Sequence, residues 1–282
     1  MIEWDLLVDG VDFGEGPRWH DGRLWYSDFY QAAIYSVGPS GDRRVEHGDL
    51  PDRPSGLGWL PDGQLLAVLM TQRRVVRFDP HGAMHPHADL ADIATGYCND
   101  MVVAADGTAY VGNFGFDLEA RSQFQLATLA RIASDGTAGP AATDMRFPNG
   151  SVITPDGSTL IVAQTFGGDF VAFDIGSDGS LAGRRTWTSV PGTSPDGCAL
   201  DTGGALWFAD AVGSQLLRVR EGGEVTDVFA TPQPAFACAL GGDDGRTLFA
   251  MCAPGPDPGD VAGRRAGAIY QRPVDLARAG RP

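Results

Sequence analysis

A tight-turn sequence recurs six times along the chain, at intervals of about forty to fifty residues, which is the period of propeller blades. Most copies are Asp-Gly, a strong hairpin signal because the turn needs positive φ. Each turn is followed by two short segments rich in aromatic and branched residues, as β-strands are. The turns are Asp21-Gly22, Asp62-Gly63, Asp106-Gly107, Asp156-Gly157, Gly203-Gly204 and Asp244-Gly245. Six copies predict six blades around a central channel.

The two ends of the chain are predicted to share the last blade. Residues Trp4 to Val8 precede the first copy and have the composition of a strand, while the sixth copy ends close to Pro282. We expect this N-terminal strand to complete the sixth blade and close the ring, which hides the sheet edges. No segment has a helical apolar period. The predicted fold is therefore an all-β, six-bladed β-propeller, with residues 1–282 forming a single domain.

Charge and composition restrict the partners. Acidic residues number 36 against 21 basic ones, a net charge of -15 that disfavours nucleic acid and acidic membrane surfaces. No secretory signal or membrane-spanning run is visible, so a cytoplasmic location is expected. The four cysteines have no zinc spacing and are interpreted as buried, reduced thiols. A monomer or weak homo-oligomer acting on a small molecule fits these features.

The first strand of a propeller blade lies nearest the axis, so residues at its start converge on one mouth of the channel. Counting seven residues back from each of the first five turns, and from Asp243 beside the sixth turn, finds the equivalent position in every copy. These positions are Gly14 with Glu15 beside it, Ser55, Asn99, Asn149, Asp196 and Phe236. A ring with two carboxylates and two amides is costly unless its charge is compensated.

Such oxygen ligands suit a divalent cation, with Ca²⁺ the best match and Mg²⁺ or Mn²⁺ also compatible. Zn²⁺ is less natural because no His or Cys belongs to the ring. The sequence thus predicts one divalent metal ion held by Glu15, Asn99, Asn149 and Asp196. The alternative reading is that Pro-Asn-Gly and Pro-Asp-Gly are ordinary turns between blades. The shared repeat position favours the metal site.

The connections that follow the second strands are expected to emerge at the same mouth. They supply Asn113 and several aromatic residues, which would give apolar walls around a polar floor, the usual layout of small-molecule sites. The expected substrate-binding residues are Ser55, Tyr97, Phe29, Asn113, Phe114, Phe166 and Phe236. The longest departure from the repeat, residues 112–125, is interpreted as either a tolerated insertion or a lid over this pocket.

Four sequence blocks together resemble the SMP-30/gluconolactonase/luciferin-regenerating enzyme (regucalcin-like) family. The blocks are Gly14-Glu15-Gly16-Pro17-Arg18-Trp19, Asn99-Asp100, Phe147-Pro148-Asn149-Gly150 and Ser194-Pro195-Asp196-Gly197. The resemblance runs from about residue 10 to 272. It implies a six-bladed propeller with one catalytic divalent metal, whose family ligands match Glu15, Asn149 and Asp196. Asn99 matches a residue that contacts substrate or metal.

The implied activity is hydrolysis of a cyclic ester. The cation would polarise the lactone carbonyl, and Asp196 is the candidate general base for the attacking water, with direct carboxylate attack left open. One position departs from the family. Sugar-lactonase members carry an Arg two residues before the Asn of the third blade, where this chain has Tyr97. The loss of that charge and its donors favours a less polar lactone or related ester.

Three other functions stay open. A metal-dependent phosphotriesterase or fluorophosphatase could use the same scaffold, since a cation can also polarise a phosphoryl group. A non-catalytic Ca²⁺-binding propeller is disfavoured by the carboxylate ring, and relatives of strictosidine synthase are expected to lack this ligand set. A Ser-His-Asp hydrolase is disfavoured because the chain has no Gly-x-Ser-x-Gly motif.

Overall fold

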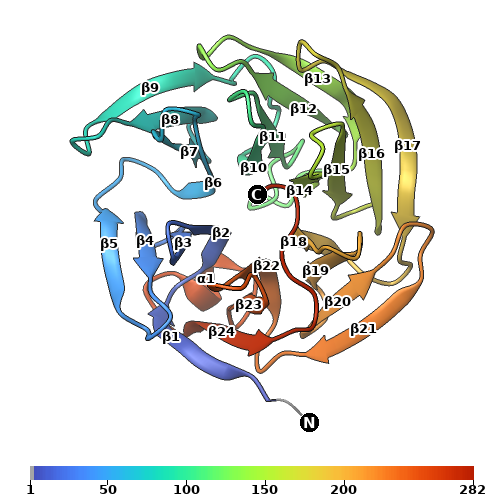
Figure 1. The fold of residues 1–282 in the computed structure, drawn as a ribbon. Helices are drawn as coiled ribbons and strands as arrows, with labels where there is room; N and C mark the ends of the chain where they lie inside the picture. Colours follow the sequence, from blue (N-terminus) through green and yellow to red (C-terminus); the bar gives the residue numbers. More distant parts are fainter. Residues whose placement is uncertain (1–2) are drawn as a thin grey trace.

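A computed structural model describes residues 3–282, which form six four-stranded antiparallel sheets arranged around a central axis (Figure 1). Each sheet is one blade, and its strands run in order from the axis outward. The innermost strands are β2 (Gly14–His20), β6 (Pro54–Trp59), β10 (Cys98–Val103), β14 (Pro148–Ile153), β18 (Pro195–Leu200) and β22 (Ala235–Gly241). The second strands are β3 (Arg23–Asp28), β7 (Leu65–Leu69), β11 (Ala109–Asn113), β15 (Thr159–Gln164), β19 (Leu206–Asp210) and β23 (Thr247–Cys252). The predicted six-bladed propeller is confirmed.

Two more strands complete each blade. The third strands are β4 (Ala33–Val37), β8 (Arg74–Phe78), β12 (Ala127–Ile132), β16 (Asp169–Ile175), β20 (Gln215–Val219) and β24 (Gly267–Pro273). The outermost strands are β5 (Arg43–His47), β9 (Met84–Asp89), β13 (Ala138–Met145), β17 (Leu181–Ser189), β21 (Val225–Ala230) and β1 (Asp5–Val11). The sequence pattern did not identify the outermost strands of the first five blades, because their residues are largely exposed and polar.

The sixth blade is built from both ends of the chain, as predicted. Strand β1 pairs antiparallel with β24, placing Leu6 opposite Tyr270 and Val8 opposite Ile269. The order β1-β24-β23-β22 shows that the N-terminal strand completes the sixth blade, and this pairing closes the ring. The blade also carries an unpredicted helix, α1 (Pro258–Val261), whose four residues are too few to show a helical period.

Packing between blades forms the core. Residues 3–282 contain six apolar clusters that each join two neighbouring blades. One cluster, for example, packs Leu66 and Val68 of the second blade against Met101 and Val111 of the third. A fully buried Leu or Val side chain contributes about 1.5–3 kcal/mol. The apolar residues of β-strands thus hold the blades in place and fix the inner strands around the axis.

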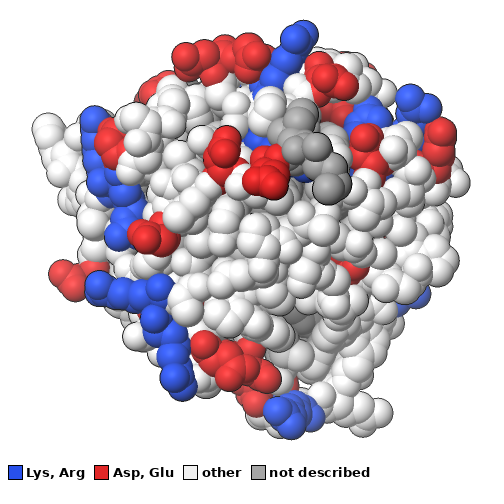
Figure 2. Space-filling view, turned by 90° about the horizontal axis from the view of Figure 1, so that it is seen from below, with Lys and Arg blue, Asp and Glu red and all other residues white. Residues whose placement is uncertain are grey.

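The outer surface and the cysteines agree with the expectations from composition. Figure 2 shows acidic and basic side chains interspersed along one edge of the propeller, without a continuous basic area. All four cysteines are buried free thiols. Among the described residues, none of the helical segments has the length and apolar character needed to traverse a lipid bilayer.

Candidate metal centre

Six residues occupy one equivalent place in the six inner strands. Each directly follows the first residue of its strand, which pairs with the last residue of the second strand in that blade. These ring residues are Glu15, Ser55, Asn99, Asn149, Asp196 and Phe236. Glu15 is in register with the others, although counting from the turns had placed it one residue off. The first hairpin is shorter, because His20 pairs with Arg23 whereas Trp59 pairs with Leu65.

A β-bulge or other register shift begins at the ring in every inner strand: it follows the first residue in five strands and follows Glu15, the second residue, in β2. Bulges redirect side chains and frequently occur beside functional sites. Glycines then allow the inner strands to approach closely. A Cβ atom at Gly150 would lie 2.4 Å from the backbone oxygen of Asp196, and one at Gly56 would lie 2.3 Å from the Met101 nitrogen. The Asn-Gly and Asp-Gly pairs are therefore required by strand packing, and they bring the ring residues of adjacent blades together.

The two ring carboxyl groups are buried and close enough to influence each other. Glu15 is 4% exposed and Asp196 is 7% exposed. Burial raises the pKa of Glu15 well above its usual range, and the negative charges of Asp196 and Asp100 raise it further. Burial also raises the pKa of Asp196, with Asp100 adding to the effect and the Asn149 amide opposing it. Within residues 3–282, neither carboxyl forms an ion pair with an arginine or histidine. A cation would remove this electrostatic cost.

Hydrogen bonds fix the orientation of the Asn149 amide. Its Nδ2 donates to the Thr165 hydroxyl at 3.1 Å, and that hydroxyl donates to the Pro195 carbonyl at 2.8 Å. The amide oxygen of Asn149 therefore points away from Thr165, and it is buried without a hydrogen-bond partner among the described residues. Thr165 connects the fourth blade to the strand that carries Asp196.

Four ring residues have a buried polar atom that is left without a partner in the described part of the chain. These atoms are Ser55 Oγ, Asn99 Nδ2, Asn149 Oδ1 and Asp196 Oδ1. Unpaired buried polar atoms are rare and need an explanation such as a bound ion. A half-turn of the Asn99 side chain exchanges its nitrogen for its oxygen. The ring can thus present two carboxylates and two amide oxygens, which fit a hard divalent cation.

The predicted metal ligands of the ring are a mixture of carboxyl and amide side chains. Residues 3–282 contain no group of three or more His, Cys, Asp or Glu side chains arranged to hold a metal. The reason is its composition, since half of the proposed ligands are asparagines. Asn and carboxylate oxygens are normal ligands for Ca²⁺, so the composition argues for a hard cation and against zinc.

A buried ion pair that was not predicted from the sequence lies next to the ring residue Asn99. Arg18 Nη2 lies 2.5 Å from Asp100 Oδ1, and both side chains are almost completely buried. The guanidinium also donates to the carbonyls of Leu57, Pro17 and Met101. Asp100 replaces the glycine that follows the ring residue in four of the other blades. This departure from the repeat, next to Asn99, was the sequence feature that could have marked Asp100 as a residue with a special role.

The remaining predicted substrate contacts lie around the ring in different ways. Ser55 belongs to the ring itself, whereas Phe29, Tyr97, Phe114 and Phe236 belong to one apolar cluster at its mouth. Phe166 is 48% exposed further out. Asn113 has a structural role, because its amide donates to the Thr128 carbonyl and accepts from Gly115 N–H. It holds the start of the connection between β11 and β12, so a direct substrate contact by Asn113 stays a prediction.

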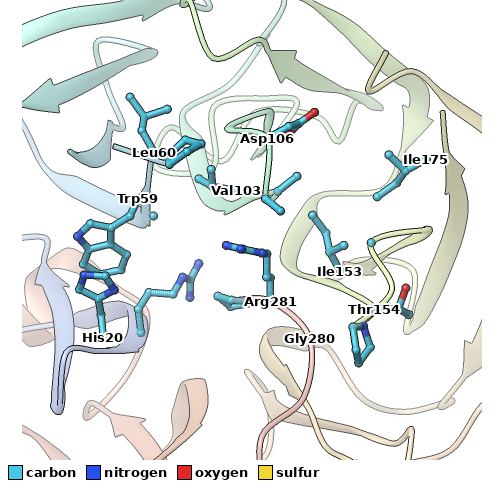
Figure 3. A pocket seen from close by; sticks show the side chains of 18 of the residues that line it. His20, Trp59, Leu60, Val103, Asp106, Ile153, Thr154, Ile175, Gly280 and Arg281 are labelled. Carbon is cyan, nitrogen blue, oxygen red and sulfur yellow. The ribbon is translucent and has the colours of Figure 1, made fainter. Parts of the chain in front are cut away.

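A large cavity occupies the opposite mouth of the channel. It has a volume of about 1330 Å³ and is lined by the turns after the inner strands, none of its lining residues being a ring residue. Figure 3 shows Trp59, Val103 and Ile153 around this mouth, with Arg281 between them. The C-terminal segment crosses here, where Arg281 and Ile153 exchange backbone hydrogen bonds.

Comparisons with known proteins show which family and which relatives the chain is similar to. The family described as the SMP-30/Gluconolactonase/LRE-like region matches residues 13–253. The pentonolactonase XacC of Haloferax volcanii is 27% identical over 95% of this chain and 92% of its own length. A 6-deoxy-6-sulfogluconolactonase of Pseudomonas putida is 27% identical over 84% of this chain and 81% of its own. A gluconolactonase structure from Xanthomonas campestris superposes with a TM-score of 0.76 and 25% identity, covering 97% of this chain and 88% of the other.

Proposed function

The chain belongs to the SMP-30/Gluconolactonase/LRE-like family, and from this premise we propose that it hydrolyses a lactone at the ring with the help of one divalent cation. The observation that carries the proposal is the pair of buried carboxyl groups, Glu15 and Asp196, which have unpaired polar atoms beside them and form no ion pair within residues 3–282. Two relatives similar over most of the chain are described as lactonases, which supports the reaction class.

Glu15, Asn149 and Asp196 would hold the cation, and Asn99 would contact either the cation or the substrate. When bound, the cation supplies a Lewis acid for the lactone carbonyl and for the oxyanion that develops from it. Ca²⁺ matches the donor set best, while Mn²⁺, Mg²⁺ and Zn²⁺ are the alternatives for the metal-loading experiment. The Asn149 oxygen is already directed by Thr165, so this ligand needs little reorganisation.

Asp196 is the proposed general base. Its Oδ1 atom has no partner within residues 3–282 and is thus free to accept a proton from the attacking water. Asn149 lies beside the same carboxyl and favours its charged form. Asn99 and Ser55 can donate hydrogen bonds from the same ring, which would orient the ester group. Burial of the ring excludes bulk water and strengthens each of these interactions.

Arg18 and Asp100 would act as positioning residues for the ring. Asp100 is held by Arg18 and by its own neighbour's backbone, because Oδ1 also accepts from Met101 N–H at 2.8 Å. The Arg18 charge lowers the pKa of Glu15 through space. Asp100 raises the pKa of Glu15 more than Arg18 lowers it, so the role we propose for the pair is to fix the position of the inner strands without occupying the free oxygen atoms of the ring carboxyls.

The test measures hydrolysis of a lactone panel by metal-stripped protein, alone and after addition of Ca²⁺, Mn²⁺, Mg²⁺ or Zn²⁺. Calorimetry measures metal affinity in parallel for Glu15→Gln, Asp196→Ala and a control, Asp62→Asn, which removes an exposed carboxylate of a turn. We expect activity restored by metal in the parent and control proteins and lost in both ring variants. Tight metal binding without hydrolysis of any lactone would refute the proposal and redirect the panel to phosphotriesters.

A further inference from the structure

A collar of residues surrounds the ring at the mouth opposite the C-terminal segment. In every blade, the residue before the inner strand accepts a backbone hydrogen bond from the residue after the second strand. Both members of each pair are thus fixed within a few residues of the ring. The six collar pairs are Phe13 with Phe29, Arg53 with Met70, Tyr97 with Phe114, Phe147 with Thr165, Ser194 with Ala211, and Pro234 with Ala253.

Most of the collar is apolar, and its members contact one another across blades. Phe13, Phe29, Met70 and Ala253 are buried in one cluster with the ring residue Phe236. Phe13 lies 4.7 Å from Phe236 and 5.2 Å from Phe29, measured between ring centroids. Tyr97, Phe114 and Ala211 are partly buried against the same cluster. The polar ring is therefore bordered by apolar side chains on this side.

The connection between β23 and β24 adds a further apolar contact over the sixth blade. Val261 of α1 is completely buried in the collar cluster. The two carboxylate oxygens of Asp12 accept hydrogen bonds from Gly263 and Arg265 N–H, which anchors this connection beside the first blade. The collar side formed by small residues, Pro234 and Ala253, is thus covered by an aliphatic side chain.

A row of aromatic rings leads from the collar to the surface. Phe114 stacks on Phe147 with centroids 4.4 Å apart, and Phe147 contacts Phe166 at 4.9 Å. Phe166 is nearly half exposed, and Phe124 of the connection after β11 contacts it at 6.0 Å. Phe147 has a φ of 62°, a conformation that is unfavourable for a bulky residue. Backbone strain of this kind is concentrated at functional sites, so it supports a role for the Phe147 ring in substrate binding.

The arginines of this region are already engaged. Arg53, the charged member of the collar, forms an ion pair with Glu119 and lies 5.1 Å above the Tyr30 ring. Arg146, which precedes Phe147, lies 2.7 Å from Asp169. A sugar lactone would bring several hydroxyl groups against aromatic carbon, and each hydroxyl loses water without gaining a partner.

We infer that the collar selects lactones whose ring carries an apolar alkyl or aryl substituent and disfavours polyhydroxylated sugar lactones. This inference rests on the proposed function, because it concerns the substrate of the same ring. The lactone group would meet the polar ring while its substituent lies against the collar and the aromatic row. Burial of each added methylene then raises kcat/KM by up to about fourfold, until the substituent passes Phe166.

The experiment compares γ-butyrolactones with alkyl substituents of one to six carbons against pentono-γ-lactones, using the metal-loaded protein. We expect kcat/KM to rise with alkyl length and to exceed the value for the sugar lactones. A flat alkyl series with preferred hydrolysis of sugar lactones would overturn this inference and leave the proposed function intact. No hydrolysis of any lactone would overturn both.

Variants identify the residues responsible. Phe166→Ser changes an exposed ring, and Val45→Ser removes another exposed apolar side chain, on the outer strand of the first blade, as a control. We expect Phe166→Ser and Phe114→Ser to raise KM for the hexyl lactone about tenfold more than for the unsubstituted lactone, Phe114→Leu to restore it, and Val45→Ser to leave both values unchanged. Tyr97→Arg should move preference toward sugar lactones. Equal losses on all substrates would contradict a role in specificity.

Discussion

Replacing Arg18 by methionine tests the reasoning about charge at the axis most directly. The substitution keeps most of the side-chain volume but removes the donor of four hydrogen bonds, one to Asp100 and three to backbone carbonyls. Asp100 would then become a third buried carboxylate near Glu15 and Asp196, without its partner. Breaking one side of a buried ion pair costs about 3–5 kcal/mol. For a chain of this size, that lowers Tm by about 6–10 °C.

The same change should strengthen cation binding. Arg18 contributes a positive charge beside Glu15, and its removal makes the ring more negative. Arg18→Met is therefore expected to unfold more easily in metal-free urea titrations and yet to bind Ca²⁺ more tightly by calorimetry. Excess Ca²⁺ should recover part of the lost stability, since a ligand that binds only the folded state stabilises it.

The double variant Arg18→Met/Asp100→Asn provides the control. It removes both charges of the pair, so most of the destabilisation should disappear, and the two substitutions should be strongly non-additive. The reasoning is refuted if Arg18→Met costs less than about 1 kcal/mol, if the double variant is as unstable as the single one, or if Ca²⁺ affinity falls in the single variant.

Three further predictions concern the ring. Thr165→Val should release the Asn149 amide and weaken metal binding about 10–100-fold, with a smaller effect on stability, as measured by calorimetry and urea unfolding. Gly150→Ala should destabilise by about 1–3 kcal/mol because its Cβ would meet the Asp196 backbone, whereas Gly139→Ala, with open space around it, should change stability by less than about 1 kcal/mol. The ring carboxyls have raised pKa values, so metal-free protein should lose stability as the pH rises above about 4, the unfolded value, and added Ca²⁺ should reverse the trend in urea titrations at successive pH values.

Much of the fold and the ring could be predicted from the sequence because a propeller repeats its geometry. Ser55, Asn99, Asn149 and Asp196 stand at one distance from their turns, so a single rule located four ring residues. Glu15 was predicted although it stands one residue from the counted position, and the structure gives the reason, since the shorter first hairpin changes the count by one.

Other features were beyond the sequence because they depend on contacts between distant segments. Arg18 and Asp100 lie 82 residues apart in the sequence, and the Asp that replaces a repeat glycine at position 100 does not identify Arg18 as its partner. The outermost strands have few apolar residues, so they lack the alternation that identifies the inner ones. Val261 reaches the mouth only through a connection pinned to Asp12, which belongs to the opposite end of the chain.

The ring and the collar use different repeat positions, and this separation explains how the site can combine a fixed reaction with a variable substrate. The ring position is constrained by the bulge and by inner strands so close that Gly56 and Gly150 admit no side chain. The collar positions are held through their backbones, whose hydrogen bonds do not depend on the side chain. Arg53 and Tyr97 occupy equivalent collar positions with opposite chemistry. A substitution in the collar therefore changes the side chains around the ring without moving Glu15 or Asp196. For this reason Tyr97→Arg should change substrate preference and leave metal affinity unchanged.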